Sequence, residues 1–198
     1  MTYDHKITEL KFHMKNLISK DVCNQLISFF EENAHMSTKE NSLKYLKDSN
    51  QNEIMTDNCS FLNLSKLLNL DGFKERYDTI IKYMKIVLVN HEIYIRNNLC
   101  PSYKNNFMTY TDNIRIIKYG VGQSIKDHSD LEQLTRGSLT INLNDDYEGG
   151  EFRFFDGKIK HSFKTGDAII FPAEPIWIHG TESIKKGVRY SINCFLGH

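Results

Sequence analysis

The spacing of apolar residues changes along the chain from a helical to a strand-like period at about residue 113. Apolar residues recur at helical spacing over 19–33, which predicts a helix with Ser19 as its N-cap. A longer apolar stripe over 71–90 predicts a second helix, capped by Asp71, whose stripe packs on a sheet. The first half of the chain therefore supplies helical support.

From residue 113 onward, apolar and polar residues alternate in short segments, which is typical of strands. Asp156-Gly157 lies between two such segments and predicts a hairpin. Helices followed by many short strands favour an α+β fold, with the strands closing into a double-stranded β-helix, a jelly roll of cupin type. We expect one domain over 1–198, with 1–112 mainly helical support and loops and 113–198 the jelly-roll core.

Composition narrows the classes of partner. The chain has 198 residues, of which 25 are basic and 25 acidic, so the formal net charge is zero. Such a balance gives no reason to expect a nucleic acid or an anionic membrane as partner. No apolar run has the length of a membrane span and the N-terminus lacks a signal peptide's hydrophobic region, so we expect a soluble cytoplasmic protein. Its four cysteines, without a C-x-x-C pair, are expected to be reduced and mostly buried.

A metal-binding pattern lies in the strand-rich half. His128 and Asp130 are two residues apart, so on an extended segment both side chains project to the same side, whereas Asp127 projects to the other. With His179 from a later strand they form two imidazoles and one carboxylate, the facial triad of non-haem Fe(II) oxygenases. Zinc uses the same ligands in hydrolytic sites. The alternative without a metal makes His128 a surface residue and His179 a core residue.

Arg189 lies in a predicted strand, and a guanidinium inside a sheet sandwich needs an anion because burying an unpaired charge is costly. Its planar fork fits a carboxylate, and Ser191, on the same face, can donate one more hydrogen bond. The alternatives are an exposed arginine or an internal ion pair. Tyr119 either hydrogen-bonds the same ligand or packs, and Thr140 and Asn142 are further inward-facing candidates.

Several motifs together resemble the prolyl 4-hydroxylase-like group of the 2-oxoglutarate/Fe(II) dioxygenase superfamily, from about residue 113 to the C-terminus. The motifs are Tyr119-Gly120-Val121-Gly122-Gln123, His128-Ser129-Asp130, Leu143-Asn144-Asp145-Asp146-Tyr147-Glu148-Gly149-Gly150-Glu151, Gly166-Asp167-Ala168-Ile169-Ile170-Phe171-Pro172, His179, and Gly187-Val188-Arg189-Tyr190-Ser191. The resemblance implies that His128, Asp130 and His179 bind Fe(II). It also implies that Arg189 binds the distal carboxylate of 2-oxoglutarate and that Tyr119 helps to hold this co-substrate.

Four positions depart from related groups. Arg189 stands where collagen-type prolyl 4-hydroxylases usually carry Lys, and Asn142 stands where oxygen-sensing enzymes use a tyrosine for the co-substrate carboxylate. Gly180 follows His179, where relatives often have a bulkier residue. Phe195 occupies the place of a second arginine in the nucleic-acid demethylases, so the pattern disfavours a nucleic acid substrate.

The resemblance implies an enzyme that uses O2 to convert 2-oxoglutarate into succinate and CO2 while it hydroxylates an unactivated C–H bond, with ascorbate as a possible reductant. The leading hypothesis is a peptidyl prolyl side chain as substrate, with lysyl second and the loop over 97–112 as a substrate wall. The alternatives are a free amino acid or small molecule as substrate, a catalytically silent binding module on the same fold, and, more remotely, a zinc-binding structural protein.

Overall fold

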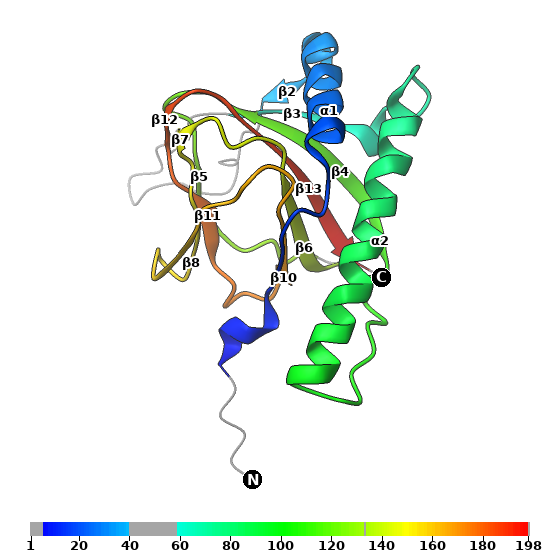
Figure 1. Cartoon of the computed structure of the whole chain (residues 1–198), viewed down its shortest axis with the longest axis vertical. Helices are drawn as coiled ribbons and strands as arrows, with labels where there is room; N and C mark the ends of the chain where they lie inside the picture. Colours follow the sequence, from blue (N-terminus) through cyan, green and yellow to red (C-terminus); the bar gives the residue numbers. More distant parts are fainter. Residues whose placement is uncertain (1–5, 40–58, 133, 198) are drawn as a thin grey trace.

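The two predicted helices form and lie on one side of the molecule (Figure 1). The structure, a computed structural model, describes residues 6–39, 59–132 and 134–197. α1 (Lys20–Glu32) is capped as expected, since Ser19 Oγ accepts a hydrogen bond from Val22 N at 3.4 Å. None of the helices in the described ranges is long and apolar enough to cross a bilayer.

The start of α2 (Phe73–Asn98) differs from the prediction. The residue that precedes the helix is Gly72, with a φ of 74°, and no side chain caps this end. The predicted Asp71 cap is therefore wrong. The left-handed backbone needed at this start suits glycine, and a stripe of apolar residues does not reveal it. The helix continues to Asn98, whereas the apolar stripe predicts an end at about residue 90 or a little beyond.

The strands form antiparallel sheets, as the α+β jelly-roll prediction requires. In chain order they are β1 (Phe12–Met14), β2 (Thr38–Lys39), β3 (Ser60–Asn63), β4 (Tyr110–Tyr119), β5 (Ile125–His128), β6 (Thr135–Asn142), β7 (Glu148–Gly149), β8 (Phe152–Phe154), β9 (Ile159–His161), β10 (Ala168–Pro172), β11 (His179–Thr181), β12 (Ile184–Lys186) and β13 (Arg189–Gly197). The larger sheet has the order β1-β10-β6-β13-β4-β3-β2, the smaller one the order β5-β11-β8-β9, and β12 pairs with β7.

The first 112 residues contribute more strand than predicted. β3 pairs with β4 and β2 pairs with β3, so both extend the larger sheet. These strands are two and four residues long, too short for an alternating pattern to stand out in the sequence. The 3-10 helices η1 (Ile7–Leu10), η2 (Ala34–Met36) and η3 (Leu64–Lys66) complete the described elements.

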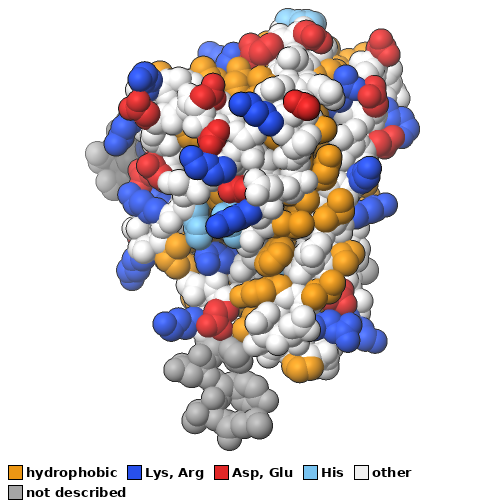
Figure 2. All heavy atoms as spheres, in the orientation of Figure 1, with side chains coloured by type: hydrophobic (Ala, Val, Ile, Leu, Met, Phe, Trp, Pro, Cys, Tyr) orange, Lys and Arg blue, Asp and Glu red, His pale blue; other side chains and the backbone are white. Residues whose placement is uncertain are grey.

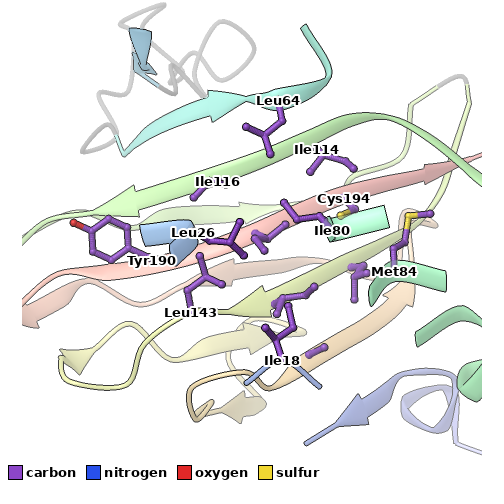
Figure 3. Close-up of a cluster of buried hydrophobic side chains, with 14 of the residues drawn as sticks. Ile18, Leu26, Leu64, Ile80, Met84, Ile114, Ile116, Leu143, Tyr190 and Cys194 are labelled. Atoms are coloured by element: carbon purple, nitrogen blue, oxygen red, sulfur yellow. The ribbon is translucent and has the colours of Figure 1, made fainter. Parts of the chain in front are cut away.

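One face of the larger sheet packs on the helices and the other faces the smaller sheet, and this division positions the site. Along β13, Ile192 and Cys194 point to the helices, whereas Arg189 and Ser191 point to the opposite, inner face. The outer core combines both helices with the sheet and includes Phe30, Leu139, Ile141 and Ile192. Figure 3 shows other members of this core, among them Leu26, Ile80, Met84, Ile114, Ile116 and Cys194. Along β6 and β13, the buried polar residues Ser138, Thr140, Asn142, Arg189 and Ser191 thus face the space between the two sheets.

A second, aromatic core joins the smaller sheet to β10. It consists of Phe152, Phe154, Phe163, Ile169, Phe171 and Trp177. The hairpin predicted at Asp156-Gly157 connects β8 to β9, which pair in the expected register. Figure 2 shows Lys and Arg side chains interspersed with Asp and Glu over the face that carries the helices, in keeping with a net charge of zero.

Candidate metal centre

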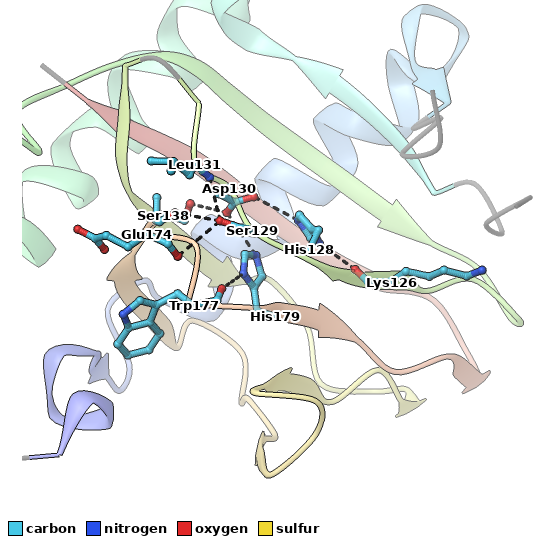
Figure 4. Close-up of polar contacts among 10 residues, drawn as sticks. Lys126, His128, Ser129, Asp130, Leu131, Ser138, Glu174, Trp177 and His179 are labelled. Carbon is cyan, nitrogen blue, oxygen red and sulfur yellow. Dashed lines mark hydrogen bonds and ion pairs between the residues drawn. The ribbon is translucent and has the colours of Figure 1, made fainter. Parts of the chain in front are cut away.

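Three side chains predicted as metal ligands converge at one end of the smaller sheet (Figure 4). His128 ends β5 and His179 begins β11, and the two residues are direct partners across this strand pair. Asp130 lies two residues beyond β5, in the turn that leads to β6. One potential ligand atom from each residue lies within 4.8 Å of the others.

The two imidazole rings are oriented so that both Nε2 atoms face Asp130. His128 Nδ1 lies 2.8 Å from Lys126 O and His179 Nδ1 lies 3.0 Å from Trp177 O. A ring nitrogen next to a carbonyl must be the donor, so in each neutral ring the lone pair is on Nε2. The Nε2 atoms are 3.2 and 3.3 Å from the two Asp130 oxygens. Lone pairs that face each other in this way need a cation between them, either protons on the imidazoles or a bound metal ion.

The spacing of these donors fits a transition-metal ion. Ligand atoms about 2.1 Å from a metal and about 90° apart are about 3 Å from each other. The separations of 3.2 and 3.3 Å are close to this value. The His128 side chain is 38% exposed, whereas those of Asp130 and His179 are 9% and 6% exposed. The site thus has a buried side and a side open to ligands.

The Asp130 carboxylate is held in its charged form. Burial raises its pKa, but hydrogen bonds and charge interactions with His128 and His179 outweigh burial and lower the pKa well below its usual range. Ser138, on β6, donates a hydrogen bond to Asp130 Oδ2. Asp130 therefore joins the smaller sheet's ligands to the inner face of the larger sheet.

Ser129, the middle residue of the His-x-Asp pattern, fixes the turn that carries Asp130. Its hydroxyl donates to Ala173 O at 3.1 Å and accepts a hydrogen bond from Leu131 N at 3.2 Å. The His-x-Asp pattern does not specify its middle residue, so no sequence signal distinguishes Ser129.

On the far side of the smaller sheet, an ion pair joins β5 to β8 and spans β11, the strand between them. Asp127 points away from the metal ligands, as predicted, and accepts a hydrogen bond from Arg153 Nε of β8 at 2.8 Å. The link passes over Gly180, where an added Cβ would lie 2.7 Å from both Asp127 Oδ1 and Ile125 O. Glycine at this position therefore permits the close approach of β5, β11 and β8 behind His179.

Arg189 lies on the inner face of the larger sheet, without an acidic partner among the described residues. It is 1% exposed and is the direct partner of Tyr119, whose ring centre lies 5.1 Å from the guanidinium carbon. Arg189 Nε donates to Asn142 Oδ1 at 3.1 Å, but its buried Nη2 has no hydrogen-bond partner among the described residues. No ion pair within the described ranges includes Arg189. An exposed arginine and an internal pair with a described residue are thus excluded, and the orphaned nitrogen fits a ligand carboxylate.

The other predicted co-substrate residues lie beside Arg189. Ser191 and Asn142 are direct partners on adjacent strands, and both are fully buried. Thr140 is also buried, one step further along β6. The Asn142 side chain also accepts a hydrogen bond from the hydroxyl of Tyr147 at 3.2 Å, a contact that no local sequence signal indicated.

The loop over 97–112, which is predicted as a substrate wall, contacts α2 and the end of β13. Asn105 N donates to Glu92 Oε2 at 3.2 Å, and Thr109 N donates to Gly197 O at 3.0 Å. These contacts fix the segment to α2 and to the end of β13 and give the wall prediction no support.

Two comparisons of sequence point to one superfamily. Residues 114–197 match the family model of the 2OG-Fe(II) oxygenase superfamily. A PKHD-type hydroxylase of Psychrobacter sp. (strain PRwf-1) is 36% identical over 78 residues. These residues are 36% of this chain but only 29% of that hydroxylase, so the match spans less than a third of the relative's length.

Solved structures share the fold over nearly the whole chain. A viral collagen prolyl hydroxylase from Paramecium Bursaria Chlorella virus-1, in complex with 2-oxoglutarate, matches with a TM-score of 0.64 and 15% identity, covering 95% of both chains. A prolyl-4-hydroxylase of Pseudomonas putida matches at 0.65 and 14%, covering 97% of both chains. A Trichoplax adhaerens prolyl hydroxylase, in complex with a hypoxia inducible factor peptide fragment, matches at 0.66 and 12%, covering 96% of this chain and 84% of that one.

Proposed function

We propose that this chain, which belongs to the 2OG-Fe(II) oxygenase superfamily through residues 114–197, hydroxylates an unactivated C–H bond of a peptidyl side chain, prolyl first and lysyl second. Arg189 is the observation that carries the proposal. Its buried Nη2 has no hydrogen-bond partner among the described residues, and it lies on the inner face of the larger sheet, whereas His128 and His179 belong to the smaller sheet. A hydrolytic zinc site or a structural zinc site has no need of such an arginine, whereas a dicarboxylate co-substrate beside the metal does.

Each residue of the site has a separate role in the proposed reaction. His128, Asp130 and His179 hold Fe(II), and Arg189 binds the distal carboxylate of 2-oxoglutarate. Bound Fe(II) supplies the oxidation by O2 that converts 2-oxoglutarate into succinate and CO2 and hydroxylates the substrate. The Tyr119 ring supports the guanidinium from one side. The protein thus contributes orientation and a charge-complementary site.

The aromatic core protects one side of the site from water. The Phe152 ring stacks on His179, with 5.4 Å between ring centres and an angle of 10° between planes. The Phe171 ring contacts the same imidazole edge-on at 4.7 Å. Exclusion of water on this side favours productive oxidation of a bound substrate over side reactions.

A peptide is the favoured substrate for two reasons. The three solved structures described above are prolyl hydroxylases, and one of them holds a peptide. In addition, Phe195 stands where nucleic-acid demethylases carry a second arginine, and the net charge is zero. The intact ligand set with an unpaired Arg189 argues against a silent binding module.

Mass spectrometry of a peptide panel tests the proposal. Purified protein is incubated with Fe(II), 2-oxoglutarate, ascorbate and O2, with peptides that contain proline or lysine and with matched peptides that contain alanine instead. We expect the mass of one oxygen atom to be added to a proline-containing peptide, and succinate to rise with it. The His179→Ala variant, which lacks a metal ligand, is the control and should give neither.

Two outcomes would count against the proposal. Succinate at the level of the His179→Ala control, with every peptide and without peptide, would contradict the oxygenase activity. Succinate formed only with free amino acids would contradict the peptidyl substrate and leave the reaction class intact.

A further inference from the structure

The Asn142 side chain has no hydrogen-bonding capacity left for a ligand. It is fully buried, and its Oδ1 accepts hydrogen bonds from Arg189 Nε at 3.1 Å and from Tyr147 Oη at 3.2 Å. Its Nδ2 donates to Asn144 O and, at 3.5 Å, to Lys164 O. A primary amide has two donor hydrogens and two acceptor lone pairs, and all four are used within the protein. A direct contact between Asn142 and the co-substrate would have to break one of them.

Asn144 fixes the backbone on both sides of Arg189. Its Oδ1 accepts a hydrogen bond from Tyr190 N at 2.7 Å, and its Nδ2 donates to Val188 O at 2.7 Å. These two peptide groups flank Arg189, so the strand that carries the guanidinium cannot shift along β6 without losing both bonds.

Packing restricts the guanidinium further. The Tyr119 ring lies against it, with the guanidinium carbon 5.1 Å from the ring centre. On another side, a Cβ at Gly150 would lie 3.3 Å from Arg189 Cδ and 3.2 Å from Tyr147 Cε2, so the absence of a side chain at Gly150 lets these two residues pack together. The turn Tyr147-Glu148-Gly149-Gly150 thereby brings the tyrosine hydroxyl to Asn142.

We propose that Asn142 and Tyr147 are positioning residues for Arg189 and do not themselves touch the co-substrate. Asn142 holds Nε, and the Nη2 edge, which has no partner in the part of the chain that the structure describes, is left to meet the distal carboxylate of 2-oxoglutarate. Tyr147 keeps the amide of Asn142 in the required orientation. This inference rests on the proposed function. Its physical basis is preorganisation, because an arginine already held in one conformation loses less side-chain entropy when the ligand binds.

The test compares two ligands that differ in the distal carboxylate. Calorimetry under anaerobic conditions on Mn(II)-loaded protein measures the binding of 2-oxoglutarate and of oxalate, which chelates a metal but has no distal carboxylate. We expect Asn142→Ala to weaken 2-oxoglutarate roughly tenfold, the equivalent of one lost hydrogen bond to a charged group. The affinity for oxalate should stay unchanged. Tyr147→Phe, which removes only a hydroxyl, should show the same pattern with a smaller loss.

A double-mutant cycle and a matched control complete the design. In the Arg189→Ala background, Asn142→Ala should cause no further loss of 2-oxoglutarate affinity, because the residue through which it acts is absent. Tyr190→Phe is the control. This variant also removes a hydroxyl beside Arg189, but the Tyr190 hydroxyl donates to Glu31 Oε1 at 2.6 Å on the opposite face, so 2-oxoglutarate should bind as in the wild type.

Three results would overturn the inference. If Asn142→Ala weakened oxalate as much as 2-oxoglutarate, Asn142 would act at the metal end of the ligand. If Asn142→Ala and Tyr147→Phe both bound 2-oxoglutarate like the wild type, Arg189 would need no positioning. If Tyr190→Phe weakened 2-oxoglutarate equally, the cause would be a general loosening of β13. A wild type that binds neither Mn(II) nor 2-oxoglutarate would instead contradict the proposed function itself.

Discussion

Replacing Arg189 by methionine should make the protein more stable in the absence of 2-oxoglutarate. Arg189 is 1% exposed, and its Nη2 has no partner among the described residues. Replacing buried charged groups by apolar side chains of similar volume is often stabilising, by about 1–4 kcal/mol. Part of this gain is offset, because the variant loses the hydrogen bond to Asn142 and the contact with the Tyr119 ring, which together are worth about 1–2 kcal/mol. We expect a net gain of about 1 kcal/mol in the free energy of unfolding.

When 2-oxoglutarate is present, the wild type should be more stable than the Arg189→Met variant. At a concentration about 100 times its Kd, a ligand stabilises the folded state by about 2.7 kcal/mol. For a chain of this size, about 1 kcal/mol corresponds to a shift in Tm of about 2–4 °C. The Tm of the wild type should therefore rise by about 5–10 °C, whereas that of Arg189→Met should stay constant. Without 2-oxoglutarate, the variant should unfold a few degrees above the wild type.

Thermal unfolding of Mn(II)-loaded protein, with and without 2-oxoglutarate, measures both effects. Arg153→Met is the matched control. Arg153 is an arginine with ion-pair partners, at 2.8 Å from Asp127 and 3.3 Å from Glu182, so its loss should lower the Tm and leave the 2-oxoglutarate shift intact. A loss of more than about 2 kcal/mol in Arg189→Met without 2-oxoglutarate would show that the guanidinium has an internal partner. A 2-oxoglutarate shift equal to that of the wild type would refute its role in binding.

Further predictions concern the support of the metal ligands and the effect of pH. Gly180→Ala would place a methyl group 2.7 Å from Asp127 Oδ1 and should lower the free energy of unfolding by about 1–3 kcal/mol and weaken Mn(II) binding; unchanged urea unfolding would contradict this. Ser129→Ala loses the hydrogen bonds that fix the Asp130 turn, so urea unfolding should show a loss of about 1 kcal/mol, together with weaker Mn(II) binding in a titration. Burial lowers the pKa of His91 and of His161 below 6.5, so the unfolded chain binds more protons and stability should fall as the pH drops below about 6.5. Urea unfolding at several pH values should give a flatter dependence for His91→Gln, and an unchanged slope would count against this account.

The sequence predicts those parts of the site that depend on local patterns. Alternation along 189–197 places Arg189 and Ser191 on the inner face, and the structure has them there. The two-residue spacing favours Asp130 over Asp127 as the third ligand, and in the structure Asp127 pairs with Arg153 instead. A period of two or of 3.6 residues is a property of neighbouring positions, so it can be detected without a fold.

Other features depend on contacts between segments far apart in the chain. Ser129 acts through the backbone of Ala173, and Asn142 acts through Arg189, 47 residues away. The tyrosine that orients Asn142 reaches it only because a turn with positive φ at Gly149 and Gly150 folds the chain back. These side chains are of common types and belong to no local pattern, so only the folded structure shows which residues they contact.

Formation of succinate is the measurement that tests the central claim most directly. The claim is that His128, Asp130 and His179 hold Fe(II) beside a 2-oxoglutarate site built on Arg189. Purified wild-type protein with Fe(II), 2-oxoglutarate and O2 should form succinate above background, and omission of Fe(II) or the change His179→Ala should abolish it. Succinate formed equally by the wild type and the His179→Ala variant, or by neither, would contradict the claim.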